Sequence, residues 1–417
     1  MNVFDVLLER GFIATEEDGT PKQVTDMKVR EVLGQDNISC YIGFDPTASS
    51  LHVGSLVQIM VLAHMQRAGH RPIAVVGGGT AMVGDPSGKS EMRKMLTQED
   101  INNNMLGLKK HLSRFIEFSE DKAMIANNAD WLSPINYIEF LRDYGVHFSV
   151  NRMLAAESVK LRLEKEQGLS FLEFNYMLLQ AFDFLHLKQN HDCVLQMGGD
   201  DQWGNICAGI DLIRRVERKS AYGITFPLIT TASGAKMGKT EQGAVWLDSE
   251  LFSPLDYYQF WRNVDDRDVK KFLGIFTFLP MEQVNELGQL QGKDINKAKK
   301  ILAFEATKLN HGEQAAKTAQ ETVEKIWSGD KKGVDLPTLT VLSSELEEGI
   351  LATELFHKLD LVPSKSEAKR LIKKGGASIN DERIQAFDFK VTSADLQDGE
   401  ILLRAGRKRY AKVVVKS

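Results

Sequence analysis

The chain has 417 residues, of which 43% are hydrophobic and 26% charged, and its formal net charge is −5. This composition excludes a disordered or collagen-like chain, and no apolar run approaches the 18 residues of a membrane-spanning helix. The three cysteines form no Cys-x-x-Cys pair, which argues against a disulfide framework and a cysteine-based zinc site. Acidic residues near the N-terminus, where a signal peptide carries positive charge, predict a protein of the cytoplasm.

The first 232 residues alternate short apolar runs with helical patterns. The runs predicted to be strands are 39–44, 71–77, 122–126 and 191–197, with a helix over about 55–67. Short, uniformly apolar strands separated by helices are typical of a parallel sheet covered on both faces. We therefore predict a doubly wound α/β domain, whose chemistry lies beyond the carboxyl ends of the strands. From Pro254 to about Trp327 the pattern changes to helices alone.

A loop follows the first strand, over Gly43–Ser55, and His52-Val-Gly opens the next helix. A helix N-terminus with a glycine in its first turn offers unpaired amides to a phosphate, and a histidine can add a hydrogen bond. Taken alone, His52 is more simply interpreted as a structural residue.

The segment after the second strand, Gly77–Ser90, nearly matches two common motifs. The dinucleotide fingerprint fails because Met82 replaces its third glycine, and the Walker phosphate loop fails because Val83 replaces its first glycine. What remains is a glycine-rich strand exit beside Asp85 and Lys89, which would let a backbone approach a ligand closely. An ordinary tight turn is the alternative.

Polar residues mark one face of a predicted helix over 175–183. Tyr176, Gln180 and Asp183 are spaced by four and three residues, so they share that face. Such a stripe in an apolar helix suggests a lined pocket, although a buried network without a ligand is the alternative. The following segment 196–205 is rich in carboxylates, amides and glycine, which suit an ammonium group and a ribose.

A glycine-bearing loop over Ser233–Gln242 places Lys236 and Lys239 three residues apart. Such a loop could close over a polyphosphate, and a solvated lysine-rich turn is the alternative. Together with the His52 segment, this loop resembles the paired His-x-Gly-His and Lys-Met-Ser-Lys-Ser signatures of class I aminoacyl-tRNA synthetases. Ser55 stands where that family usually has histidine or asparagine, and Gly238 and Thr240 replace two serines, as is familiar in its tyrosine branch.

The combined motifs closely resemble the tyrosyl-tRNA synthetases of bacterial type along the whole chain. They are Gly-Phe-Asp-Pro-Thr, Gly-Asp-Pro-Ser-Gly-Lys, Tyr-x-x-x-Gln-x-x-Asp and Gly-Gly-x-Asp-Gln-Trp-Gly-Asn. The resemblance implies a Rossmann-like doubly wound parallel sheet, then a helical domain and a small α+β RNA-binding domain. The expected divisions are a catalytic domain with a dimerising insertion (1–232), a mobile lysine loop with a helical anticodon-side domain (233–330), a linker (331–350) and an RNA-binding domain (351–417).

The resemblance also implies roles for individual residues. The tyrosine substrate would be bound at its phenol by Tyr41 and Asp183, and around its amino and carboxylate groups by Tyr176, Gln180, Asp85 and Gln196. ATP and the adenylate would be bound by Gly43, Asp45, His52, Gly54, Gly199, Asp201, Gln202 and Lys239. The catalytic groups at the phosphates would be Thr47, His52, Lys236, Lys239 and Thr240, with Lys89 and Arg93 near pyrophosphate and the incoming tRNA.

The implied reaction joins L-tyrosine to the 3′ end of tRNA(Tyr). The tyrosine carboxylate attacks the α-phosphorus of ATP, which brings Mg²⁺ on its phosphates, and the terminal ribose hydroxyl of tRNA then attacks the adenylate carbonyl. Because the nucleophile belongs to the substrate, the protein supplies positioning and positive charge, and no protein-bound metal is expected. The implied partners are L-tyrosine, ATP, tRNA(Tyr) and a second subunit in a homodimer, without a membrane.

Two rival functions are considered. A tryptophanyl-tRNA synthetase is disfavoured by the Tyr41 and Asp183 pair and by the C-terminal tail. A non-catalytic RNA-binding derivative of a synthetase is disfavoured by the intact lysine loop.

The C-terminal tail differs in charge from the rest of the chain. Residues 351–417 carry a net charge of +5 and the first 350 residues −10, so the negative total hides a basic module. A capped helix is predicted after Ser364, with Glu367 completing a capping box. Its basic residues and a later cluster suit RNA phosphates, and the tail resembles the RNA-binding module of ribosomal protein S-four. The predicted RNA-binding residues are Lys365, Lys369, Arg370, Lys373, Arg407, Lys408 and Arg409. A merely solvated basic face is the alternative.

Overall fold

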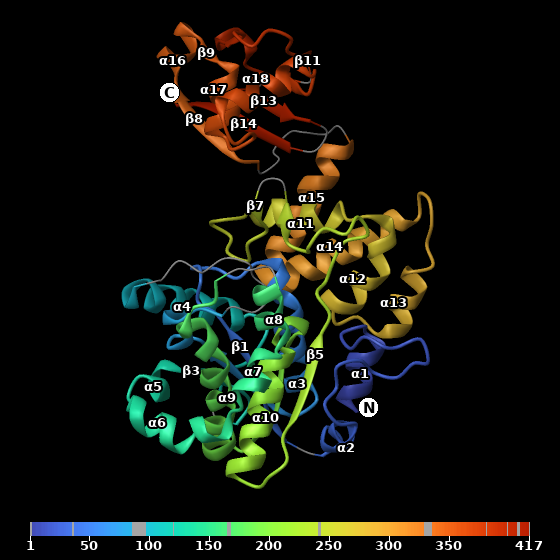
Figure 1. Cartoon of the computed structure of the whole chain (residues 1–417). Helices are drawn as coiled ribbons and strands as arrows, with labels where there is room; N and C mark the ends of the chain where they lie inside the picture. The colour runs from blue at the N-terminus through green and yellow to red at the C-terminus, as the bar shows by residue number, and fades with distance from the viewer. Residues whose placement is uncertain are drawn as a thin grey trace. The chain divides into compact units, whose positions relative to one another are not determined.

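The computed structural model in Figure 1 divides into two compact units, Met1–Lys317 and Thr318–Ser417. The residues that it describes are 2–35, 37–85, 97–119, 121–164, 168–240, 243–328, 336–380, 382–397, 399–406 and 409–416. No helix in the described ranges combines the length and apolar character needed to cross a bilayer.

A five-stranded parallel sheet forms the centre of the first unit, in the order β3-β2-β1-β4-β5. Its strands are β1 (Ser39–Phe44), β2 (Arg71–Val76), β3 (Met124–Asn127), β4 (Cys193–Gly199) and β5 (Tyr222–Phe226). The chain runs outward from β1 to β3 and then returns to the other side of β1. The predicted doubly wound sheet is therefore confirmed, with its topological switch point between β1 and β4.

Helices cover both faces of this sheet. Helix α3 (Leu56–Arg67) connects β1 to β2 and α10 (Trp203–Val216) connects β4 to β5, and each packs against the two strands that it joins. The 21-residue helix α9 (Phe171–His191) packs against α10, and its Leu178, Ala181 and Leu185 share a core with Tyr41 of β1. The shorter helices around this sheet are α1 (Val3–Glu9), α2 (Lys28–Val32), α4 (Gln98–Leu112), α5 (Ala129–Leu132), α6 (Tyr137–Asp143), α7 (Val150–Leu154) and α8 (Glu157–Glu164).

The predicted helical segment follows the sheet. Its helices are α11 (Pro254–Arg262), α12 (Val269–Phe276), α13 (Met281–Leu287), α14 (Ile295–His311) and α15 (Glu313–Ser328). Trp261, Phe272 and Phe276 pack together in its core. Arg10, just after α1, donates hydrogen bonds to the carbonyl oxygens of Gly274, Thr277 and Leu279, so the N-terminus is fixed to the end of α12.

The second unit contains a small mixed α+β fold with its own core. Its sheet has the order β11-β10-β13-β14-β8. The elements are β8 (Thr338–Leu342), α16 (Ser343–Glu348), β9 (Ile350–Leu351), α17 (Ala352–Lys358), α18 (Lys365–Lys373), β10 (Ala377–Ile379), β11 (Glu382–Arg383), β12 (Lys390–Val391), β13 (Glu400–Ala405) and β14 (Arg409–Lys416). Leu355, Phe356, Ile372, Ile401 and Leu403 are buried in the core.

Two predictions for this part of the chain need correction. Residues 338–350, placed in the linker 331–350, are folded: β8 pairs in parallel with β14, and Val341 joins the core. Strand β8 was not predicted because the Gly- and Pro-rich stretch directly before it is typical of a linker. The capping box at α18 is only half formed, because the Ser364 hydroxyl accepts from the Glu367 amide while the Glu367 carboxylate accepts from Arg370.

Candidate functional site

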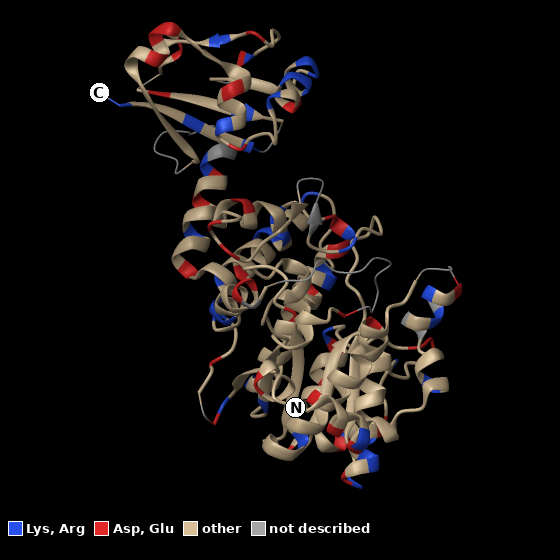
Figure 2. Ribbon diagram, turned by 60° about the vertical axis from the view of Figure 1, so that its left-hand side comes forward, with Lys and Arg blue, Asp and Glu red and all other residues tan. Residues whose placement is uncertain are grey.

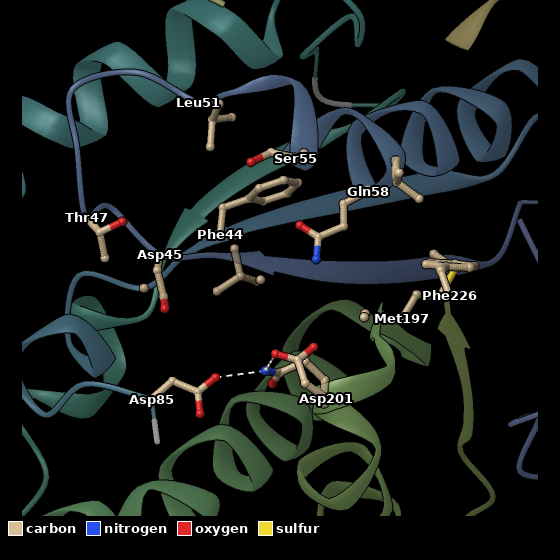
Figure 3. Close-up of a pocket in the computed structure, with 18 of the residues that line it drawn as sticks. Phe44, Asp45, Thr47, Leu51, Ser55, Gln58, Asp85, Met197, Asp201 and Phe226 are labelled. Carbon is tan, nitrogen blue, oxygen red and sulfur yellow. Dashed lines mark hydrogen bonds between the residues drawn. The ribbon is translucent and has the colours of Figure 1, made fainter. Parts of the chain in front are cut away.

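A cavity of about 510 Å³ opens at the carboxyl ends of β1 and β4, the switch point of the sheet. Ser55 and Gln58 lie above β1 in the view of Figure 3, and Asp85 and Asp201 lie below it. The cavity is lined by the following residues that the sequence pointed to: Tyr41, Gly43, Asp45, Thr47, His52, Gly54, Asp85, Tyr176, Gln180, Asp183, Gln196, Gly199, Asp201, Gln202 and Lys236. Segments far apart in the chain thus contribute to one concave site, as is typical of small-molecule binding.

Four predicted residues cannot be placed in this way. Lys239 and Thr240 form the short strand β6, which pairs with β7 (Gly243–Ala244), but their side chains are not described. Lys89 and Arg93 belong to 86–96, outside the described residues.

The deep end of the cavity contains a buried carboxylate with two fixed donors. Asp183 is only 4% exposed, and it accepts hydrogen bonds from Asn128 Nδ2 at 3.0 Å and Trp131 Nε1 at 2.7 Å. Burial raises the pKa of Asp183 to about 7. The Tyr41 hydroxyl is buried and has no hydrogen-bond partner among the described residues, and burial together with the Asp183 charge raises its pKa. This end is therefore suited to a ligand hydroxyl that can both donate and accept.

Asn128 and Trp131 were not singled out from the sequence. Asn128 is 1% exposed, and besides Asp183 it donates to the Thr80 hydroxyl and accepts from the Gly79 amide at 2.8 Å. It therefore joins the glycine segment after β2 to helix α9. A signal was available, because Asn128 directly follows β3 (Met124–Asn127), where a parallel sheet carries its functional residues.

Carboxamides and carboxylates surround the middle of the cavity. Gln202 Nε2 donates to Asp85 at 2.8 Å, and Asn205 Nδ2 donates to the Gln180 oxygen at 3.1 Å. The Gln196 oxygen is buried without a partner in the described part of the chain. Burial, and then the Asp85 charge, raise the pKa of Asp201. Since these carboxylates repel one another, this region favours a cationic group such as an ammonium.

The lysine loop lies directly against the start of the helix after β1. A Cβ added to Gly238 would meet the Gly54 nitrogen at 2.7 Å, and Gly238 has φ +82°, so both the contact and the backbone require glycine. The Gly54 amide donates to His52 Nδ1 at 3.0 Å, so this amide, expected to be open to a phosphate, is held by the histidine. Lys236 brings positive charge to the same mouth of the cavity.

The segment that follows the lysine loop is hydrogen-bonded to the His52 segment. The Val53 amide donates to the Val245 carbonyl at 2.9 Å, and the Leu247 amide donates to the Leu51 carbonyl at 2.8 Å. The base of the loop is thus anchored beside the mouth of the cavity.

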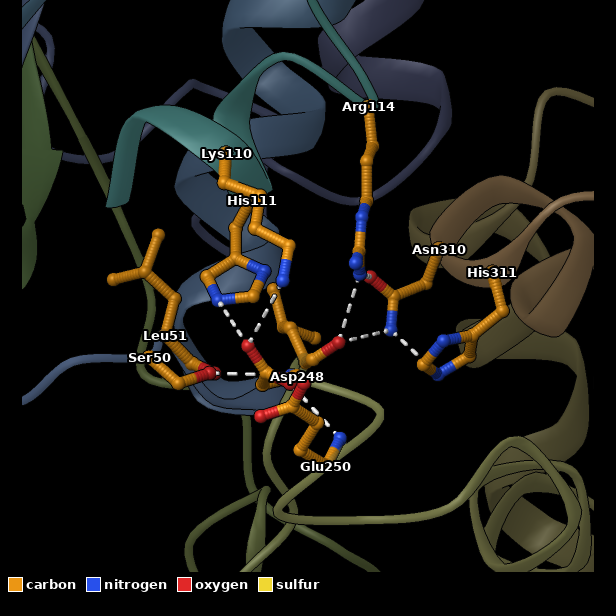
Figure 4. Close-up of polar contacts among 10 residues, drawn as sticks. Ser50, Leu51, Lys110, His111, Arg114, Asp248, Glu250, Asn310 and His311 are labelled. Carbon is orange, nitrogen blue, oxygen red and sulfur yellow. Dashed lines mark hydrogen bonds and ion pairs between the residues drawn. The ribbon is translucent and has the colours of Figure 1, made fainter. Parts of the chain in front are cut away.

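A polar network fixes the other side of this segment (Figure 4). Leu247's carbonyl accepts from Arg114 Nη1 at 2.9 Å and from Asn310 Nδ2 at 3.1 Å, and Asp248 lies 3.6 Å from both His111 and Lys110. Because Asn310 lies in α14, the helical segment is linked to the base of the lysine loop through buried hydrogen bonds.

The predicted RNA-binding residues occupy two elements of the second unit, in which basic segments recur along the ribbon (Figure 2). Lys365, Lys369, Arg370 and Lys373 lie on α18, and Arg409 begins β14. Arg407 and Lys408 fall outside the described residues.

The raised pKa of Asp183 predicts a pH-dependent stability difference between the native protein and the Asp183→Asn variant. In the folded state Asp183 keeps its proton up to about pH 7, whereas in the unfolded state it loses the proton near the ordinary aspartate pKa of 3.8. The Asp183 contribution is therefore fully present below about pH 4 and is lost as the pH rises through about 7. As the pH rises from about 4 to about 7, the free energy of unfolding of Asp183→Asn should therefore increase relative to that of the native protein by up to about 4 kcal/mol.

The measurement is urea unfolding of both proteins at several pH values between 4 and 8. His64, His111 and His311 have lowered pKa values, of about 3, 4 and 4, and act in the opposite sense, but they are present in both proteins and cancel in the difference. The variant also loses a hydrogen-bond acceptor for Asn128 or Trp131, which changes its free energy of unfolding by the same amount at every pH. If the difference in unfolding free energy between the two proteins did not change with pH, the raised pKa of Asp183 would be wrong.

Comparison with known proteins finds matches over nearly the whole chain. Residues 34–328 match the family of tRNA synthetases class I (W and Y), and residues 332–413 match the tyrosine--tRNA ligase SYY-like C-terminal domain. A tyrosine--tRNA ligase of Desulfatibacillum aliphaticivorans is 56% identical over 434 residues, covering 100% of this chain and 99% of the relative. One of Clostridium botulinum (strain Hall) is 55% identical over 416 residues, covering 99% of each.

Solved structures show the same likeness. A C-terminally truncated mitochondrial tyrosyl-tRNA synthetase of Aspergillus nidulans aligns with a TM-score of 0.68 and 29% identity, over 78% of this chain and 94% of that one. A tyrosyl-tRNA synthetase of Archaeoglobus fulgidus, complexed with L-tyrosine, aligns with a TM-score of 0.55 and 17% identity, over 76% of this chain and 99% of that one. At 17% identity, the match with the Archaeoglobus fulgidus structure shows a shared fold only.

Proposed function

The chain belongs to the class I tRNA synthetases, as a tyrosine--tRNA ligase, and from this premise we propose how its own residues carry the reaction. Its substrates are tyrosine, ATP and tRNA(Tyr). The observation that carries the proposal is the deep end of the cavity, where the Tyr41 hydroxyl has no described partner and Asp183 is held by two donors.

The substrate phenol binds between Tyr41 and Asp183. Asp183 accepts a hydrogen bond from the substrate hydroxyl, and the Tyr41 hydroxyl supplies the second hydrogen bond. A side chain without the hydroxyl would leave both buried groups unpaired, which is costly. Asn128 and Trp131 act as positioning residues, since their hydrogen bonds fix the Asp183 carboxylate.

The substrate backbone binds in the middle of the cavity. The α-ammonium lies near Asp85, Tyr176 and Gln180, and Gln196 is close to the carboxylate. The concentration of carboxylates and carboxamide oxygens around Asp85 and Gln180 supports this orientation of the ammonium. It directs the tyrosine carboxylate toward the mouth of the cavity, where ATP enters.

ATP and the adenylate occupy the mouth. The ribose and adenylate contact Gly43, Asp45, Gly54, Gly199, Asp201 and Gln202, and the phosphates face Thr47, His52, Lys236, Lys239 and Thr240, with Mg²⁺ carried on them. Lys89 and Arg93 act near pyrophosphate and tRNA. The protein contributes orientation of the attacking carboxylate and cations at the developing phosphoryl charge. The anchored base of the lysine loop supports this arrangement, because it keeps the loop beside His52.

The C-terminal unit holds tRNA through the basic residues predicted from the sequence. The position of Lys365, Lys369, Arg370 and Lys373 on one short helix supports this role, since successive turns can meet successive phosphates. Arg407, Lys408 and Arg409 form the second basic cluster of the proposal.

Two subunits form a homodimer through the insertion between β3 and α9. Large apolar side chains are exposed over this region and at the first residue of α9: Tyr137, Ile138, Val146, Val150 and Phe171 are each between 55% and 69% exposed. Such a surface favours an isologous contact. Sedimentation equilibrium tests it, because Phe171→Asp should give the mass of a monomer.

We also place the enzyme in the cytoplasm. Its three cysteines, two of them buried, are all unpaired thiols, as expected in a reducing compartment.

Pyrophosphate exchange tests the proposed function and its pocket. Exchange should require tyrosine and should not proceed with tryptophan or without an amino acid. Tyr41→Phe should raise the KM for tyrosine about threefold to tenfold, the loss of one hydrogen bond. Tyr257→Phe, which removes a buried hydroxyl away from the cavity, is the matched control. Equal exchange with tryptophan, or an unchanged KM in Tyr41→Phe, would contradict the assignment.

A further inference from the structure

The basic residues of α18 are not equally available to a partner. Lys365 lies 3.5 Å from a carboxylate oxygen of Glu354, and Arg370 lies 2.5 Å from one of Glu367. Lys369 and Lys373 have no carboxylate partner within the part of the chain that the structure describes. The uncompensated charge of the helix is therefore centred on Lys369 and Lys373, one turn apart.

An exposed aromatic ring lies next to this charge. Phe387 is 59% exposed, and the Lys369 ammonium lies 5.6 Å from the centroid of its ring. That distance is within the range of a cation–π contact. Phe389, two residues later, packs against the core of the unit, so the chain buries one phenylalanine and presents the other.

We infer that Phe387 is a stacking platform for an unpaired base of the bound tRNA, with Lys369 and Lys373 at the flanking phosphates. This inference rests on the proposed RNA-binding role of the C-terminal unit. RNA is recognised largely through splayed-out bases that stack on aromatic side chains beside cations. Lysines alone would give attachment along any phosphate backbone, whereas a stacked base requires a nucleotide outside a duplex.

A protein partner is the competing occupant, and the surroundings disfavour it. In the described residues of this unit, the only other large apolar side chains with high exposure are Leu342 and Leu351, at the ends of β8 and β9. Protein interfaces bury a continuous apolar centre and are depleted in lysine there. A single exposed ring beside two lysines that have no carboxylate partner in the described residues fits an anionic partner with flat aromatic groups.

The test uses the full-length enzyme and three substitutions of Phe387. Phe387→Ala should lower kcat/KM for tRNA and weaken tRNA binding by about tenfold or more, within the range measured for base stacking. Phe387→Leu should fail to restore binding, and Phe387→Trp should restore it and show fluorescence quenching when tRNA is added. Leu342→Ala, which removes a comparably exposed side chain in the same unit, should leave binding unchanged.

Salt dependence separates the ring from the lysines. Lys369→Gln should reduce the slope of log Kd against log salt by about one, whereas Phe387→Ala should shift the line without changing its slope. Tyrosine-dependent pyrophosphate exchange and the thermal midpoint should stay at native values in Phe387→Ala.

Three results would overturn the inference. Native tRNA binding by Phe387→Ala would leave a protein partner as the occupant, and full rescue by Phe387→Leu would show a simple apolar contact. A lowered thermal midpoint in Phe387→Ala would show a structural ring. None of these results would affect the RNA-binding role of the whole unit, which removal of that unit tests separately.

Discussion

Adenylate formation is expected to slow by about 10²- to 10³-fold when Lys239 is replaced by alanine, the usual cost of removing one preorganised group that stabilises developing charge. The affinity for tyrosine should change by less than about twofold, because the phenol and ammonium sites that we propose are formed by other residues. The loop that carries Lys239 is positioned by the contact between Gly238 and Gly54 and by the pairing of Val245 with Val53. Removing the ammonium should therefore leave the loop in place and lose only its charge.

Stopped-flow measurement of activation at saturating tyrosine, with ATP varied, checks this expectation, and equilibrium dialysis gives the tyrosine affinity. Lys236→Ala should show a loss of the same kind, because Lys236 lines the mouth of the cavity. Lys219→Ala, an exposed lysine paired with Glu217, is the matched control and should be silent. Activation rates within twofold of native, about 0.4 kcal/mol, would remove Lys239 from the mechanism.

The sheet could be predicted because its strands are short, apolar and separated by helices. Strand β1 begins and ends at the predicted residues, and α3 begins one residue later than predicted. Strand β4 begins two residues late, because α9 continues to His191 and ends at Asp192 in the left-handed conformation. Helix ends of this kind depend on a single residue and are weakly marked in the sequence.

The site was predictable to the extent that each motif directly follows a strand or lies on one helix face. The spacing of Tyr176, Gln180 and Asp183 places all three at the cavity. The contacts of Asn128 and Trp131 with Asp183 depend on the distance between β3 and α9, which no local pattern contains, and only the position of Asn128 directly after β3 pointed to a functional role. The pairing of Lys365 and Arg370 with carboxylates likewise became visible only in three dimensions, as did the lack of a carboxylate partner for Lys369 and Lys373 among the described residues.

Removal of residues 329–417 is expected to lower kcat/KM for tRNA charging by at least about 10²-fold while leaving tyrosine-dependent pyrophosphate exchange within about twofold. The second unit carries its own sheet and core, so the first unit should stay folded without it. The cut must precede β8. Truncation at residue 351 would leave β8 without β14, its partner over Thr338–Leu342, and an unpaired strand edge invites aggregation.

The size of the expected loss follows from the charge that is removed. The removed segment 329–417 carries a net +2, because its basic part, residues 351–417, carries +5 and residues 329–350 carry −3. Each phosphate neutralised by one of the basic residues contributes about −0.9 to the slope of log affinity against log salt. Four such contacts are worth about 10²-fold between 50 and 200 mM salt, so the full chain should lose tRNA affinity steeply with salt and the truncated chain only weakly. Aminoacylation assays of the full and the truncated chain across this salt range measure the difference. Tyrosine-dependent pyrophosphate exchange is the control for the activity of the first unit. Native charging by the truncated chain, with the same salt slope, would mean that the acidic body alone holds the tRNA.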